Sequence, residues 1–126
     1  MAASPRSRHG RLASIARASA AVAWAERSLR AARRALPTQG LGVRIDPPAR
    51  AFHRLTPIVE RWLHWRDATC LERALLLQAW YVALGQPHDV LIGVADVTDQ
   101  VLAHAWLDHE DPLDHAVLTR VRPPSA

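Results

Sequence analysis

The spacing of the apolar residues changes at Gly85, from a helical period before it to an extended pattern after it. Before Gly85, apolar residues recur every three or four positions, as in amphipathic helices, over residues 12–36, 56–65 and 70–84. After Gly85, β-branched and aliphatic residues predict strands at residues 89–94, 101–107 and 113–118. The sequence therefore predicts an α+β fold with N-terminal helices first, then a third helix packed on a small antiparallel sheet.

The helical stretches also carry start and stop signals. The first is predicted to end at residues 36–40, which include Pro37 and Gly40, and its apolar face consists of Leu12, Ile15, Ser19, Val22, Leu29 and Leu36. Thr56 and Pro57 predict a cap and a first-turn proline for the second helix, whose tryptophans Trp62 and Trp65 are expected in the core. The third helix is expected to bury Leu71, Ala74, Leu75, Gln78 and Val82, and to close at Gly85 and Pro87.

Charge is divided unevenly along the chain. Residues 1–66 hold 13 of the 16 arginines and 3 of the 12 acidic residues, a balance of +10, whereas residues 67–126 have a balance of −6. The basic front is expected either to meet an acidic partner or to be a solvated helix face, and the two readings stay open. With 126 residues the chain has room for one domain, residues 1–126. No stretch is long enough to span a membrane and the N-terminus makes a poor secretion signal, so we expect a soluble, cytoplasmic protein.

Cys70 is the only cysteine, and it stands where the third helix begins. Thr69 and Glu72 have the spacing of a capping box, which makes Cys70 the first helical residue. The unpaired amides and positive dipole end of a helix N-terminus favour a thiolate there, and the thiolate is the nucleophilic form of cysteine. Cys70 is therefore a candidate nucleophile, with a buried and inert cysteine as the alternative.

A base for this thiol is available in the second predicted strand, at His104. If the second and third strands form a hairpin that turns near residues 109–110, positions 114–116 face His104, and Asp114 can reach its ring. Cysteine, histidine and an orienting carboxylate form the arrangement of thiol acyl transfer. Asp111, in the turn, and Asp108, just after the second strand, are the alternative acids, and a slip of one residue in register would change which residue faces His104.

Three ordered segments resemble a known family. They are Cys70-Leu71-Glu72-Arg73-Ala74-Leu75, then Ala83-Leu84-Gly85 leading to Val90-Leu91-Ile92-Gly93-Val94, then Ala103-His104-Ala105-Trp106-Leu107-Asp108. Together they resemble the transglutaminase-like cysteine peptidase of lasso peptide biosynthesis, the B protein of such clusters, most closely from Cys70 to Asp114.

The resemblance implies a transglutaminase-like, papain-like core and a leader peptidase that cuts a ribosomal precursor peptide between leader and core. It implies Cys70 as nucleophile, His104 as base and Asp114 as the acid. Because this chain has no room for the additional leader-recognition domain of longer relatives, we expect a separate recognition protein and a separate ATP-dependent macrolactam cyclase as partners. No cofactor and no metal ion are expected.

Two other classes compete with the peptidase. One is a basic non-enzymatic module that binds nucleic acid or an acidic partner, as the sequence pI of about 10.9 suggests. The other is a metal site made by Cys70, His104, His109 and His115, although their spacing matches no standard zinc pattern. The remaining histidines, including His88, have no spacing that indicates chemistry.

Overall fold

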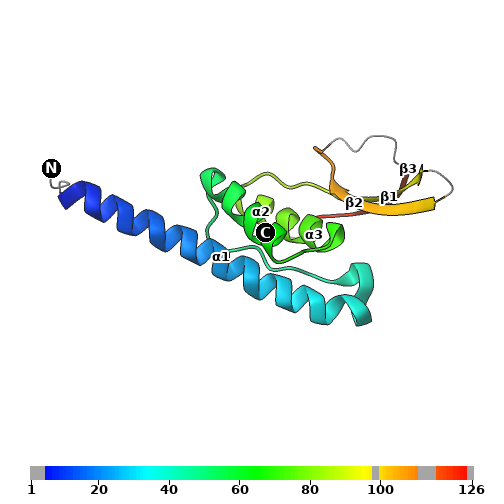
Figure 1. Cartoon of the computed structure of the whole chain (residues 1–126), viewed down its shortest axis with the longest axis horizontal. Coiled ribbons are helices and arrows are strands. Elements are labelled where there is room, and N and C mark those ends of the chain that lie inside the picture. Colours follow the sequence, from blue (N-terminus) through cyan, green and yellow to red (C-terminus); the bar gives the residue numbers. More distant parts are fainter. Residues whose placement is uncertain (1–4, 98–99, 111–115, 125–126) are drawn as a thin grey trace.

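The computed structural model describes residues 5–97, 100–110 and 116–124 (Figure 1). In chain order its elements are α1 (Pro5–Gln39), two short 3₁₀ turns η1 (Gly40–Gly42) and η2 (His53–Leu55), α2 (Thr56–Trp65), α3 (Cys70–Ala83), β1 (Val90–Val97), β2 (Gln100–Leu107) and β3 (Ala116–Val121). The helices precede the strands, and the strands form one antiparallel sheet. The predicted α+β class is confirmed.

Helix α1 is a long rod whose N-terminal half projects beyond the rest of the molecule (Figure 1). The part that packs on α2 and α3 buries Ala21, Trp24, Ala25, Leu29 and Ala32. The predicted apolar face of α1 is covered only in part, because Leu29 is fully buried whereas the side chains of Leu12 and Ile15 are 65% and 61% exposed. Helical spacing identifies an apolar face, but it does not show whether another element covers that face.

None of the described helices combines the length and the apolar composition needed to cross a bilayer.

Helix α2 has proline in its first turn as predicted, but Thr56 is its first residue and not its cap, so that the predicted cap is wrong. Its cap residue is Leu55, and no side chain caps its first turn. The Thr56 hydroxyl instead accepts a hydrogen bond from the indole nitrogen of Trp80, 2.9 Å away, which ties α2 to α3. Val59 and Leu63 bury the inner face of α2, whereas Trp65, predicted in the core, is 70% exposed.

The strand order in the sheet is β2-β1-β3, with β1 in the centre. β1 and β2 form the predicted antiparallel pair, in a register that joins Val90 to Leu107 and Gly93 to His104. β3 pairs with β1 and not with β2, so the predicted hairpin of the second and third strands is wrong. β3 also lies later in the chain than predicted, at Ala116–Val121.

Helix α3 lies between α1 and the sheet, and six residues of the hydrophobic core belong to it, Ala74, Leu75, Leu76, Leu77, Ala79 and Trp80. Residues 74–80 are all buried, because α1 and α2 cover one side of the helix and β2 covers another. The buried amide of Gln78 donates hydrogen bonds to the backbone oxygens of His88 (3.0 Å) and Val121 (2.9 Å). These two bonds satisfy a polar group that would otherwise be costly to bury, and they fix the helix against the start of β1 and the end of β3.

Glu26 anchors an ion-pair network where α1 crosses α2. Its carboxylate accepts hydrogen bonds from Arg66 (2.8 Å), Arg30 (2.7 Å) and the Trp62 indole (3.1 Å). The hydrogen bonds from Arg66 and then from Arg30 lower the pKa of Glu26 from 4.5 to about 2. In the folded protein this carboxylate therefore stays ionised at a pH that protonates it in the unfolded chain.

Acid should remove this contribution to stability. Since the pKa of Glu26 falls from 4.5 in the unfolded chain to about 2 in the folded one, the stabilisation is complete above pH 4.5 and is lost as the pH falls toward 2. The Glu26→Gln variant should melt below the wild type at pH 7, and the two melting temperatures should converge near pH 2. Thermal melts between pH 2 and 7 test this. The control is Asp46→Asn, which changes an exposed carboxylate. Its melting temperature should depend on pH in the same way as that of the wild type. If the melting temperatures of Glu26→Gln and of the wild type fall in parallel as the pH is lowered, the ion pairs of Glu26 do not cause the loss of stability in acid.

Candidate active site

Cys70 is the first residue of α3, and the predicted capping box of Thr69 and Glu72 is confirmed. The Glu72 amide donates to the Thr69 hydroxyl (3.1 Å), and the Thr69 amide donates to the Glu72 carboxylate (2.9 Å). Cys70 itself is half-buried and packs against the hydrophobic core. The sulfur is thus carried at the start of a helix, beside the backbone amides of its first turn.

Glu72 is the acidic residue nearest to Cys70 in the sequence, and its carboxylate forms an ion pair with an arginine. The guanidinium Nε of Arg33, on α1, lies 3.2 Å from this buried carboxylate. The same guanidinium donates to the backbone oxygen of Arg66 at 2.8 Å, in the break between α2 and α3. Arg33 therefore offsets the charge of Glu72 and fixes the chain just before the cysteine.

His104 lies on β2, the strand that packs on α3, and at the edge of the sheet. Its ring stacks on that of Trp106, with centroids 5.8 Å apart. Side chains alternate along a strand, so His104 and Trp106 share one face of β2, while Ala105 and Leu107 turn to the other face, in the core that Cys70 contacts. The pairing of the Cys70 sulfur with the His104 imidazole stays a prediction.

The structure changes the argument about the acid. Opposite His104 stands Gly93 of β1, so the reasoning that placed Asp114 across a hairpin from His104 does not hold. Asp114 and Asp111 lie outside the described residues, and Asp114 stays a prediction that rests on the family resemblance alone. Asp108 binds elsewhere: its Oδ1 lies 2.7 Å from Nδ1 of His88, and its Oδ2 accepts from the Asp89 amide at 3.1 Å.

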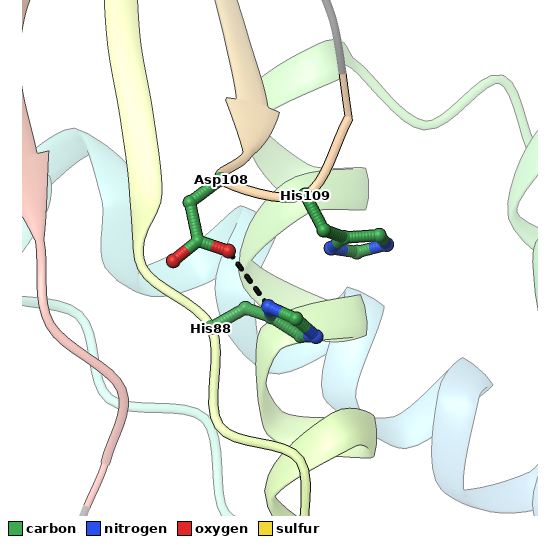
Figure 2. A group of neighbouring side chains, drawn as sticks. All are labelled: His88, Asp108 and His109. Atoms are coloured by element: carbon green, nitrogen blue, oxygen red, sulfur yellow. Dashed lines mark hydrogen bonds and ion pairs between the residues drawn. The ribbon is translucent and has the colours of Figure 1, made fainter.

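A second cluster of titratable groups lies just past the end of β2. There His88, Asp108 and His109 present their polar atoms toward one another, beside α3 (Figure 2). Tyr81 of α3 meets both imidazole rings edge-on, with centroids 5.2 Å away in each case. Sequence reasoning gave His88 no chemistry. The pairing of β1 with β2 could have revealed the cluster, because a register that joins Val90 to Leu107 also brings the residues just before β1 close to those just after β2.

The predicted alternative of a metal site at Cys70, His104, His109 and His115 is not what the structure assembles. His115 lies outside the described residues. Among the described residues, the histidine, cysteine and acidic side chains close enough to share one ion are His88, Asp108 and His109, a group that includes neither Cys70 nor His104.

The turn after β2 is also clamped to the first turns of α3. Arg73 donates to both carboxylate oxygens of Glu110, at 3.1 and 3.0 Å, and Glu110 accepts from the Leu107 amide at 3.0 Å. Burial raises the pKa of Glu110, but the bonds from Arg73 and Leu107 outweigh it and leave that pKa below its ordinary value. Because Arg73 lies one helical turn after Cys70, this clamp fixes the end of β2 relative to the candidate nucleophile.

The geometry defines an α+β protein in which a helix headed by cysteine packs on an antiparallel sheet that carries a histidine. A sequence model of the transglutaminase-like superfamily matches residues 3–122, and the chain belongs to this superfamily. The superfamily includes cysteine peptidases, whose nucleophile is a thiolate. Searches of curated proteins and of solved structures gave no significant match.

Proposed function

We propose that this chain is a cysteine peptidase that removes the leader peptide from a ribosomally made lasso peptide precursor. The observation that carries the proposal is the place of the chain's one cysteine, at the first residue of α3 under a complete capping box, in a transglutaminase-like chain. The assignment to lasso peptide precursors rests on the three resembling segments around Cys70, Val90–Val94 and His104.

In the proposed reaction, His104 takes the proton of the Cys70 thiol, and the thiolate attacks the scissile carbonyl at the end of the leader. The backbone amide of Cys70, at the start of α3, is one donor for the resulting oxyanion. Protonated His104 gives its proton to the departing amine of the core peptide, which leaves the leader as a thioester on Cys70. Water, deprotonated by His104, then cleaves the thioester, releases the leader as an acid and restores the thiol.

This reaction requires the His104 ring to reach the sulfur. In the structure, His104 lies on the face of β2 opposite to Ala105 and Leu107, which belong to the core that Cys70 contacts, so a shift of β2 or of the start of α3 has to bring the two side chains together. Catalytic hydrogen bonds in enzymes without substrate are often long or misaligned and tighten when substrate binds. We propose that the bound leader, or its recognition protein, draws the two side chains together.

The partners of the peptidase are part of the proposal. Leader binding is assigned to a separate recognition protein, and the freed core amine passes to a separate ATP-dependent cyclase. Of the arginines from Arg27 to Arg34, in the C-terminal half of α1, Arg30 and Arg33 bind Glu26 and Glu72 within the chain. Arg27 and Arg34 are exposed and not engaged in this way, so they are the better candidates for contact with the recognition protein.

Reconstitution tests the proposed function. The purified chain is incubated with a lasso precursor peptide, with and without a leader-recognition protein, and the products are followed by liquid chromatography and mass spectrometry. The expected products are an intact leader acid and an intact core with a free amine, formed much faster when the recognition protein is present. A precursor that stays uncut with every component present would contradict the proposal, as would cleavage inside the core.

A further inference from the structure

The cluster at the end of β2 brings together the side chains that bind transition metals. His88 comes from the segment before β1, and Asp108 and His109 follow β2. The cluster therefore joins the start of β1 to the end of β2 (Figure 2). One ligand atom from each residue lies within 4.8 Å of the other two. The two imidazole rings are 4.1 Å apart between centroids, and Tyr81 packs against both.

We propose that His88, Asp108 and His109 form a binding site for one divalent transition metal ion of the zinc class. Two imidazole nitrogens and one carboxylate oxygen suit Zn²⁺, Ni²⁺ or Cu²⁺, whereas Mg²⁺ and Ca²⁺ prefer sites made of oxygen atoms alone. Three protein ligands leave one position of a tetrahedral ion for water. This site is independent of Cys70 and of the proposed peptidase reaction.

One ligand pair already has a spacing near that found around a bound ion, and the ligand atoms of the other two pairs lie within 4.8 Å of each other. Ligand atoms around tetrahedral zinc lie about 3.3 Å apart, since each bond is about 2.0–2.1 Å long. His88 Nδ1 and Asp108 Oδ1, now 2.7 Å apart, need to separate by only about 0.6 Å for the ion to replace the proton between them. His109 and Asp108 are exposed, so their side chains can make this adjustment without disturbing the core.

Groups around the cluster already orient the ligands. The Asp89 amide donates to Oδ2 of Asp108 at 3.1 Å, which leaves Oδ1 for the ion. Tyr81 holds both imidazoles edge-on from α3. Supporting contacts of this kind matter for affinity, because altering them in known metal sites typically costs 10–100-fold. A bound ion would cross-link the entry of β1 and the exit of β2 next to α3.

Calorimetric titration with zinc chloride tests the site. The titration uses the full chain carrying Cys70→Ala, so that the thiol cannot bind zinc. One ion per chain is expected, and His88→Ala, Asp108→Asn and His109→Ala in this background should each weaken binding at least about tenfold. Asp108→Asn keeps the size of the side chain and removes the anionic ligand, so it separates loss of the ligand from loss of packing.

The matched control is His64→Ala, which removes an exposed histidine from α2 and should leave zinc affinity unchanged. Circular dichroism of every variant without metal establishes that each one folds. If circular dichroism shows that His109→Ala does not fold, His109→Gln is used in its place. The absence of saturable zinc binding would overturn the proposal. Equal affinities in the parent and the three ligand variants would also overturn it, and so would a loss in His64→Ala as large as theirs.

Discussion

Replacing Cys70 with alanine is expected to abolish leader release, by more than about 10⁴-fold, in the reconstituted reaction. The loss follows from the proposed mechanism, in which the Cys70 sulfur forms the bond that breaks the peptide and no other thiol exists in the chain. His104→Ala should lower the rate less, by about 10²–10⁴-fold, because it removes a proton acceptor and leaves the nucleophile in place. Initial rates of core formation, measured by chromatography, give both numbers.

Controls separate chemistry from folding. Cys70 is half-buried and packs against the core, so the thermal melt of Cys70→Ala must be compared with that of the wild type. His64→Ala, on the exposed side of α2, is matched to His104→Ala and should keep the wild-type rate. Leader release by a folded Cys70→Ala protein at a rate near that of the wild type would reject Cys70 as the nucleophile.

Substituting alanine for Gly93 should destabilise the fold more than a change of one methyl group suggests. A Cβ atom at Gly93 would lie 2.5 Å from the backbone oxygen of Ala116 and 2.6 Å from Cη2 of Trp106. The backbone oxygen belongs to β3, which pairs with β1 through a register shift at this position, so it has little freedom to move. We expect the free energy of unfolding to fall by about 1–3 kcal/mol and the Tm by roughly 3–12 °C.

The control for this prediction is Gly10→Ala. A Cβ atom at Gly10, in the projecting half of α1, would meet nothing within 4 Å, and alanine is a better helix former than glycine. The control should therefore have a Tm equal to or slightly above that of the wild type. If Gly93→Ala melts at the wild-type temperature, then Trp106 and β3 do not approach Gly93 as closely as described here.

The sequence predicted the local structure around Cys70 well, because that structure depends on near neighbours. The capping box needs only Thr69 and Glu72, three residues apart, and α3 begins where this spacing places it. The close of α3 follows from Gly85, which adopts a positive φ of 76° that other residues rarely take. The β1–β2 pair follows from two extended runs separated by a short turn.

Long-range features were not predictable in the same way. The pattern of β3 suits a strand but does not say which strand it pairs with, and the argument for Asp114 depended on the wrong partner. The apolar face of α1 runs from Leu12 to Leu36, but its spacing does not tell which part is covered: Leu29 is buried, whereas Leu12 and Ile15 are exposed. The ion pairs of Glu26 with Arg66 and of Arg33 with Glu72 join residues about 40 positions apart, which no local spacing reveals.

The most direct test of the central claim is the rate at which Cys70 reacts with a precursor analogue that carries an electrophile at the scissile carbonyl. Intact-protein mass spectrometry with peptide mapping follows the reaction in the wild type, in His104→Ala and in His64→Ala. A single adduct on Cys70 is expected, forming at the wild-type rate in His64→Ala and far more slowly in His104→Ala. An adduct on another residue, or labelling of Cys70 at a rate that His104→Ala leaves unchanged, would contradict it.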